Sequence, residues 1–361
     1  MKILLLGFAK LKFMPYAKFY LEQIDRQRHE IHLVYWNRDL KDEDASAFSG
    51  IRLHEFRCLQ SDAVPKREKL SSFRAYRRFV KSVLATGTFD FIISLHTLPG
   101  LTVLDTLLRK FRGRYILDYR DSTLEEHWWF RHFVGKMAAG AKVTFVSSDA
   151  FRKYLPQKDD VKIITSHNLL VDSLNHRDYQ KTPSDRIRIA FWGLLRHANL
   201  NKLIIDRLGG DLRFELHYYG RELTMGDILR EHCRQVGADN VYFHGEYRPE
   251  DRYEFAKNTD LIHNIYMDVN TLLAMGNKYY DGIIFRIPQI CMTGSFMAEM
   301  CEKNGIGLAA DPRNGNFADK VYQYYTTLRR DNFNAQCDRE LERVLREYNE
   351  GQSMLKTIFN S

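Results

Sequence analysis

The alternation of strand-like and helix-like segments limits the possible folds of this chain more than any other feature of its sequence. Short runs rich in Ile, Val, Leu and aromatic residues are separated by segments in which apolar residues recur with helical spacing. This order specifies right-handed crossovers and a parallel sheet covered by helices. In the first half, strands are predicted at 2–6, 30–35, 51–56, 91–95, 114–118, 142–146 and 162–165, and helices at 15–27, 71–84 and 101–111.

A polar stretch at 172–185 interrupts the alternation, which then begins again. A chain of 361 residues also exceeds what one hydrophobic core usually organises. The sequence therefore predicts an α/β protein with two tandem Rossmann-like, doubly wound domains facing a cleft, at 1–175 and 186–335, and a C-terminal helix within 336–361 that packs back toward the first domain. In the second half, strands are predicted at 187–192, 213–219, 241–244, 261–266, 287–292 and 307–309, and helices at 199–208, 225–236, 249–258, 276–285, 295–304 and 338–348.

The cysteines and the apolar segments indicate where such a protein works. The five cysteines form no C-x-x-C pair and have no metal-type spacing with histidine, so neither a zinc site nor a disulfide framework is expected. The apolar run 3–6 is too short for a signal peptide and is predicted as the first strand, and every longer apolar segment is interrupted by charged residues or histidine. We expect a cytoplasmic protein, either soluble or peripheral on the inner face of the cytoplasmic membrane.

The net charge of +8 implies an anionic partner. No nucleic-acid-binding module is recognisable, so a nucleic acid partner is not expected. The helix at 71–84 has an apolar face and separate basic residues, which suits either an anionic membrane surface or a core-packed helix with a solvated basic face. The segment 127–133 (HWWFRHF) is a second aromatic and basic cluster.

Ligands of open parallel sheets bind at the carboxyl ends of the strands, so residues just after strands are the candidate site residues. Gly276 and Asn277 open a helix whose free N–H groups and dipole suit a phosphate, and the carboxylate of Asp281 follows about one turn later, where it can accept two ribose hydroxyls. If the phosphate and the ribose belong to a nucleotide, the loop 244–248 is predicted to hold the nucleotide's base, with Tyr247 stacking on that base and Arg248 beside it.

A second group of candidates follows the predicted strand 187–192. Gly193 ends this strand, and Arg196 and Lys202 follow at a spacing that lets both cations reach one diphosphate. They would neutralise charge on a departing nucleotide. The alternative is an ordinary helix start with two surface cations. Likewise, Asp281 is alternatively a helix N-terminal acid that stabilises the dipole.

Polar residues also follow two strands of the first half. His96 follows the strand at 91–95, and Arg120 and Asp121 follow the strand at 114–118. We predict these three as the catalytic residues, because a carboxylate such as Asp121 can orient an acceptor hydroxyl or take its proton. The alternatives are that Asp121 caps the next helix and that His96 is a hydrogen-bonded residue at a strand end.

These motifs resemble those of one known family. The stretch 276–311 is similar to the donor-binding segment of the retaining family 4 glycosyltransferases of the GT-B fold, with Asn277, Lys278, Asp281, Pro288, Gly294 and Glu299 at or close to the matching places. The similarity covers most of 187–311 and, more weakly, the N-terminal half, where 114–121 resembles a strand-D-x-R-D segment. Two positions depart from the pattern: Asp281 stands where the family has Glu, and Leu273 stands where a Glu often contacts the donor sugar.

The resemblance implies a retaining glycosyltransferase with a nucleotide-sugar donor as substrate and no cofactor. Its acceptor would be a glycan, lipid-linked as in the members of this family that synthesise cell-surface polysaccharides. No Asp-x-Asp pair of the metal-dependent enzymes is found, so we expect no metal site. Two alternatives stay open: a nucleotide-sugar epimerase, and a non-catalytic relative that binds a nucleotide sugar.

Overall fold

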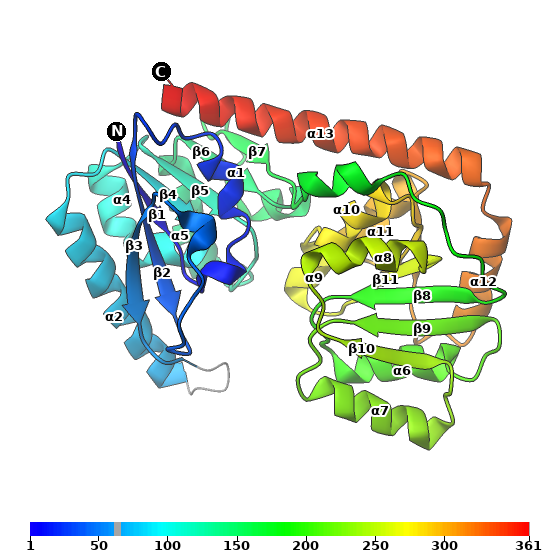
Figure 1. Cartoon of the computed structure of the whole chain (residues 1–361). Helices are drawn as coiled ribbons and strands as arrows, with labels where there is room; N and C mark the ends of the chain where they lie inside the picture. Colours follow the sequence, from blue (N-terminus) through cyan, green and yellow to red (C-terminus); the bar gives the residue numbers. More distant parts are fainter. Residues whose placement is uncertain (61–65, 361) are drawn as a thin grey trace. The chain divides into compact units, whose positions relative to one another are not determined.

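The computed structural model describes residues 1–60 and 66–360, which form two compact units (Figure 1). Unit 1 comprises Met1–His167 and the residues from Arg346 on, and unit 2 comprises Asn168–Leu345. The first boundary therefore lies before the polar stretch 172–185 rather than within it, because the 3-10 helix η4 (Val171–His176) already belongs to unit 2. Each unit is an α/β layer structure with a wholly parallel sheet.

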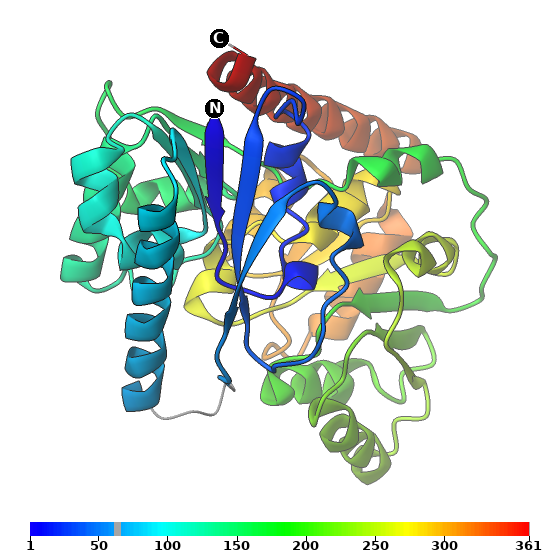
Figure 2. The same cartoon turned by 60° about the vertical axis from the view of Figure 1, so that its left-hand side comes forward.

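Unit 1 contains a seven-stranded parallel sheet in the order β3-β2-β1-β4-β5-β6-β7 (Figure 2). All seven predicted strands of the first half are confirmed to within two residues at each end. Their side chains are buried on both faces, as expected for a parallel sheet between helices. The strands are β1 (Lys2–Leu6), β2 (Glu30–Asn37), β3 (Arg52–Arg57), β4 (Phe91–Leu95), β5 (Tyr115–Tyr119), β6 (Val143–Val146) and β7 (Ile163–Thr165).

The helices of unit 1 depart more from prediction. The expected helix at 101–111 is two helices, because Val103, with φ −123°, leaves the helical conformation between them. The expected helix at 71–84 is longer at both ends, and the helix at 128–140 was not predicted at all. The helices are α1 (Ala17–Leu21), α2 (Lys66–Thr86), α3 (Thr97–Thr102), α4 (Leu104–Lys110) and α5 (Trp128–Gly140), with short 3-10 turns η1 (Leu11–Phe13), η2 (Ser46–Phe48) and η3 (Asp149–Tyr154).

Helix α2 packs its apolar face into the core of unit 1. Tyr76 and Val80 are fully buried, and the Tyr76 ring stacks on Trp36 with centroids 5.7 Å apart. The Tyr76 hydroxyl donates to the carbonyl oxygen of Gly7 at 2.6 Å. Apart from Leu70, which is 51% exposed, the large apolar side chains described on α2 are buried or partly buried, and of the two alternatives for this helix the structure supports the core-packed one.

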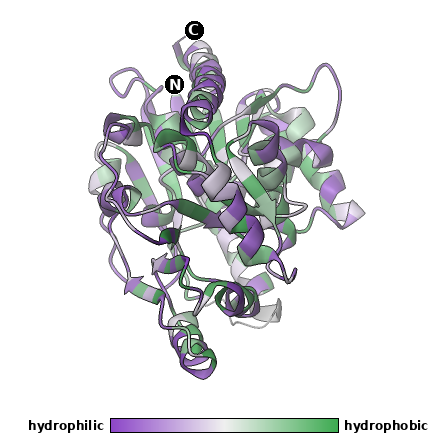
Figure 3. Cartoon of the chain, turned by 90° about the vertical axis from the view of Figure 1, so that its right-hand side faces the viewer, coloured by the Kyte–Doolittle hydropathy of each residue, from purple (hydrophilic) through white to green (hydrophobic). Residues whose placement is uncertain are grey.

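Unit 2 contains a six-stranded parallel sheet in the order β10-β9-β8-β11-β12-β13, and again all the predicted strands are confirmed. In Figure 3 apolar residues dominate the strands, whereas the helices combine apolar and hydrophilic residues. The strands are β8 (Ile187–Trp192), β9 (Phe214–Tyr219), β10 (Val241–Gly245), β11 (Leu261–Asn264), β12 (Gln289–Met292) and β13 (Gly307–Ala310). The helices are α6 (Ala198–Leu208), α7 (Met225–Val236), η5 (Pro249–Asp251), α8 (Arg252–Lys257), α9 (Val269–Leu273), α10 (Asn277–Ile284), α11 (Phe296–Lys303) and α12 (Phe317–Thr327).

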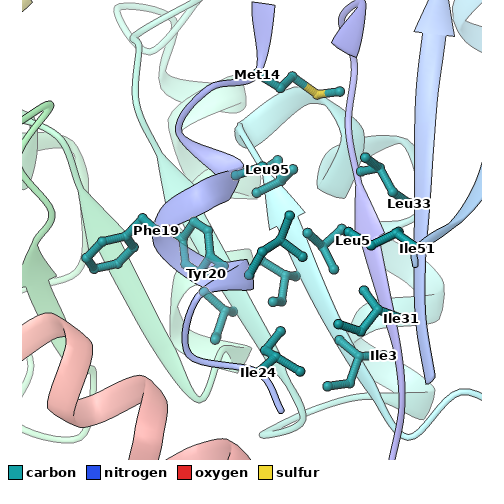
Figure 4. Packing of buried hydrophobic residues seen from close by; sticks show 14 of the residues in the cluster. Ile3, Leu5, Met14, Phe19, Tyr20, Ile24, Ile31, Leu33, Ile51 and Leu95 are labelled. Carbon is teal, nitrogen blue, oxygen red and sulfur yellow. The ribbon is translucent and has the colours of Figure 1, made fainter. Parts of the chain in front are cut away.

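The last helix, α13 (Arg330–Asn360), contributes to both cores. In unit 2 its Glu340 accepts a hydrogen bond of 2.7 Å from the buried hydroxyl of Tyr279. In unit 1 its Leu355 and Phe359 belong to the main hydrophobic cluster, other members of which are shown in Figure 4. A helix predicted only at 338–348 is thus 31 residues long, because apolar residues of both its halves are covered.

Candidate functional site

The strand order of unit 2 reverses between β8 and β11, and their carboxyl ends form the topological switch point at which such sheets bind ligands. Gly193 follows β8 with φ +144°, and its N–H donates to the carbonyl of Tyr219 at 2.9 Å. Gly220 follows β9 with φ +138°, and a Cβ on it would lie 1.7 Å from the carbonyl oxygen of Gly193. Only glycines let the two turns approach this closely.

Lys278 lies at this switch point. Its Nζ lies 4.6 Å from the ring centre of Phe191 on β8 and 5.1 Å from that of Tyr266, which follows β11. A Cβ on Gly193 would be 3.3 Å from the same Nζ. Burial lowers the pKa of Lys278 to about 8, with the positive charge of Arg196 acting in the same direction and Asp281 opposing it. Within the described residues, no carboxylate forms an ion pair with this ammonium.

The start of α10 adds backbone donors beside Lys278. Gly276 is the N-cap, in extended conformation, and no side chain caps this helix. Asn277, the first helical residue, is exposed. The N–H of Tyr279 donates to the carbonyl of Gly276 at 3.0 Å, whereas the N–H groups of Asn277 and Lys278 in this uncapped turn are available to an anion, and the helix dipole adds to the attraction. The structure thus brings Gly193, Gly276 and Asn277 to the one edge of the sheet where Lys278 lies.

Arg196 and Lys202 lie on two consecutive segments, the loop after β8 and helix α6. Arg196 is exposed in the loop after β8, close enough for its positive charge to act together with burial in lowering the pKa of Lys278. Lys202 lies in the second turn of α6, half-buried, and makes no hydrogen bond or ion pair with any described residue. Of the two predicted phosphate-binding cations, Arg196 is close enough for its charge to act on Lys278, and the role of Lys202 stays a prediction.

Asp281 does not offer a free carboxylate. Its side chain is 4% exposed, and its oxygens accept from Nη1 of Arg252 at 2.9 and 3.1 Å and from Nε1 of Trp192 at 2.8 Å. Burial raises the pKa of Asp281, and the neighbouring Arg252 opposes that shift. In this structure the carboxylate of Asp281 therefore connects α10 to α8 and β8, and the binding of a ribose by Asp281 stays a prediction.

The loop after β10 carries an aromatic wall. Tyr247 is half-buried and meets the ring of Phe255 edge-on at 5.2 Å, and Phe255 stacks on Tyr219 at 3.9 Å. Burial raises the pKa of Tyr247 to about 12, so its hydroxyl stays protonated at neutral pH. The side chain of Arg248 is 81% exposed and pairs with Asp251 at 3.0 Å. Tyr247 belongs to this wall, whereas Arg248 points to solvent.

In unit 1 the structure brings His96 and Asp121 together at the carboxyl ends of β4 and β5. Nε2 of His96 lies 3.7 Å from Oδ2 of Asp121. Nδ1 of His96 accepts from the N–H of Leu98 at 3.4 Å, which places the proton of the neutral ring on Nε2, facing Asp121. The backbone of His96 has φ +92° and ψ 162°, a conformation that residues other than glycine rarely adopt. Strain of this kind is concentrated at functional sites.

Arg120 is not part of this exposed pair. Its side chain is 7% exposed, its Nε donates to Oδ2 of the fully buried Asp118 at 2.7 Å, and its guanidinium lies 4.6 Å from the ring centre of Tyr16. Burial raises the pKa of Asp118, and the charge of Arg120 opposes that shift. Arg120 is therefore a buried cation paired with Asp118, and its predicted catalytic role stays a prediction.

Two searches of the described residues complete the description. No group of three or more His, Cys, Asp or Glu side chains in residues 1–60 and 66–360 is placed to hold a metal ion. None of the helices in that part of the chain combines the length and the apolar character needed to cross a bilayer.

Comparison with known proteins identifies the architecture. No family model and no curated protein matches the sequence. Among solved structures, sucrose-phosphate synthase from Thermosynechococcus elongatus superimposes with a TM-score of 0.72 at 12% identity, over 100% of this chain and 98% of that one. Anabaena HepE in complex with UDP-glucose gives 0.66 at 15% identity, over 99% and 100%. This chain has the GT-B fold. A UDP-N-acetylglucosamine 2-epimerase is also similar, with a TM-score of 0.59 at 14% identity, over 94% and 90%.

In this GT-B protein the sequence reasoning missed one site residue. Lys278 was noticed as part of a motif but given no role, whereas Lys202 was selected for its distance from Gly193 along the chain. The available signal was its position directly after the glycine that opens a helix, where a side chain can reach back over the strand ends. Its aromatic surroundings, Phe191 on β8 and Tyr266 in the loop after β11, come from segments that only the fold brings together.

Proposed function

We propose that this protein is a glycosyltransferase that binds a nucleoside diphosphate sugar at the switch point of unit 2. The observation that carries the proposal is Lys278, an ammonium held between two aromatic rings without a carboxylate partner among the described residues, beside the uncapped start of α10. A cation desolvated in this way gains most from an anion that arrives with the ligand. The similar HepE structures, which contain UDP and UDP-glucose, support a UDP-sugar as the donor.

The same groups would assist the transfer step. As the bond between sugar and diphosphate breaks, negative charge grows on the departing nucleotide. Lys278 and Arg196 would stabilise that charge, and the N–H groups of Asn277 and Lys278 would bind a phosphate oxygen. Tyr247 would form one side of the base site, next to Phe255.

Unit 1 would bind the acceptor. The pair of His96 and Asp121 suits an acceptor hydroxyl, because Asp121 is exposed and His96 is held by its strained backbone. Following the resemblance in the sequence, we propose retention at the anomeric carbon, turnover without a metal, and a lipid-linked glycan acceptor in cell-surface polysaccharide synthesis. NMR of the product would test retention, and turnover that stops with a chelator and returns with Mg²⁺ or Mn²⁺ would refute metal independence.

A thermal-shift experiment with UDP, GDP, CMP, ADP and dTDP tests donor binding. A nucleotide that binds only the folded protein raises its melting temperature. At a nucleotide concentration of a hundred times Kd, the free energy of unfolding increases by about 2.7 kcal/mol. We expect one nucleotide to act on the wild type and on Lys303→Met, an exposed lysine at the end of α11, but not on Lys278→Met. Lys202→Met tests the other cation predicted from sequence. Equal shifts in Lys278→Met and the wild type would refute the proposal.

The likeness to a UDP-N-acetylglucosamine 2-epimerase favours one alternative enzyme, a nucleotide-sugar epimerase. Epimerisation needs no acceptor, so conversion of the nucleotide sugar by the protein alone would identify it. The non-catalytic alternative rests on Leu273, the last residue of α9, at the place where the family often has Glu. A thermal shift without any turnover on acceptor mixtures would favour that alternative.

A further inference from the structure

Helix α5 of unit 1 carries exposed apolar side chains that belong to neither site described above. Trp128 is 73% exposed, and Trp129, Phe133 and Leu124 are each more than 40% exposed. We call these four residues the α5 patch. The other two of the four tryptophans in the chain, Trp36 and Trp192, are buried. Large aromatic side chains grouped at a protein surface indicate an interaction site.

Two grooves flank the α5 patch. One, of about 700 Å³, is mainly apolar and lies between α5 and the α3–α4 segment, with Leu104, Leu108, Trp129 and Phe133 in its lining. The other, of about 560 Å³, lies between α5 and the η3 region and includes Trp128. Apolar and polar binding surfaces therefore lie side by side on one helix.

The second groove is strongly basic. Arg131, Lys136, Lys153 and Lys158 line it, and none of its described lining residues carries a carboxylate. The nearest acid in the apolar groove, Asp105, is paired with Arg77 and Lys81 at 3.0 and 2.8 Å. The described residues that line the two grooves thus carry more cations than carboxylates, and the nearby carboxylates of Glu126 and Glu125 act electrostatically on Tyr154 of the basic groove.

We propose that the α5 patch docks this protein on an anionic lipid bilayer. Trp128, Trp129 and Phe133 would enter the interface between headgroups and acyl chains, which tryptophan prefers, and the four cations would contact lipid phosphates. Each cation near such a surface contributes about 1 kcal/mol. This inference is independent of the proposed transfer reaction and places the surface on α5, not on α2, whose described large apolar side chains other than Leu70 are buried or partly buried.

Vesicle binding tests the proposal. We expect the protein to sediment with vesicles of 30% phosphatidylglycerol in phosphatidylcholine at low salt, and much less with pure phosphatidylcholine. Removing two cations at about 1 kcal/mol each weakens binding about thirtyfold, so Lys153→Glu with Lys158→Glu should lose at least that factor. The matched control is Arg74→Glu with Arg78→Glu, which makes the same change in charge at two exposed positions of α2 and should bind as the wild type does.

Tryptophan fluorescence supplies a second readout. Among the four tryptophans only Trp128 and Trp129 are exposed, so bilayer lipids with brominated acyl chains should quench the tryptophan fluorescence of the wild type. Trp128→Ser should bind these vesicles more weakly and show less quenching. Three results would overturn the proposal: no binding of the wild type to anionic vesicles, equal losses in the α2 control, or a dimer in solution that Trp128→Ser dissociates without vesicle binding. Nucleotide thermal shifts measured without lipid report on the donor site separately.

Discussion

At the residue scale, the lowered pKa of Lys278 predicts how nucleotide binding at the proposed donor site depends on pH. Burial lowers this pKa from its usual 10.5 to about 8, so the folded protein holds a charged ammonium only below about pH 8. A bound diphosphate requires that charge. We therefore predict that nucleotide affinity falls as pH rises above about 8, by up to about tenfold per pH unit, as measured by calorimetric titration.

The matched measurements use Lys278→Met, whose weak affinity should stay flat between pH 7 and 10. The free energy of unfolding of the wild type changes in the opposite direction from its nucleotide affinity: it rises as pH rises above about 8. The unfolded lysine still binds its proton between about pH 8 and 10.5 whereas the folded one does not, so the destabilisation caused by Lys278 is full below about pH 8 and disappears as pH rises to 10.5. A parallel pH dependence of affinity in wild type and variant would exclude Lys278 as the phosphate ligand.

His96 provides a second prediction at this scale. At its φ of +92° a residue with a Cβ is strained, which lowers the free energy of unfolding, whereas glycine is not strained there. We predict that His96→Gly is more stable than His96→Ala by about 1 kcal/mol, as measured by urea unfolding, and that both lose transfer activity because both lack the imidazole beside Asp121. If His96→Ala is the more stable of the two, the strained backbone is not a feature of this site.

At the scale of elements, Asp281 connects three of them. It lies on α10 and holds Arg252 of α8 and Trp192 of β8, all of them buried. We predict that Asp281→Asn destabilises the protein by about 3–5 kcal/mol in urea unfolding, because the guanidinium of Arg252 remains buried without its counter-charge. The control is Glu254→Gln on the same helix α8, which breaks the exposed pair with Lys257 and should cost less than about 1 kcal/mol. Similar losses in the two variants would contradict the structural role of Asp281.

The same examples show how far the sequence predicts this structure. The positions of the strands along the chain followed from short apolar runs, because burial on both faces leaves a clear pattern, whereas their order in each sheet came only from the structure. Helix α5 escaped prediction because it is apolar on two faces: Phe130, Val134 and Met137 are buried, whereas Trp128 and Trp129 face solvent. The role of Asp281 was missed because Trp192 is 89 residues away along the chain, and only the folded sheet makes them neighbours.

At the scale of the whole molecule, α13 takes part in two cores, and matched substitutions can separate them. Phe359 is 1% exposed in the core cluster of unit 1, and Phe333 is equally buried on the part of the helix that belongs to unit 2. Replacing a buried phenylalanine by alanine costs about 3–5 kcal/mol. We predict that Phe359→Ala lowers the calorimetric melting transition of unit 1, and that Phe333→Ala lowers that of unit 2.

The nucleotide identifies the transitions, because it should raise only that of the unit that binds it. If the donor site lies in unit 2, as proposed, the transition that UDP or another nucleotide raises is the one that Phe333→Ala lowers, and Phe359→Ala leaves the size of that shift unchanged. If both variants lower one common transition equally, the two cores unfold as a single cooperative unit. In that case α13 joins them energetically as well as along the chain, and loss of either phenylalanine weakens nucleotide binding at elevated temperature to the same extent.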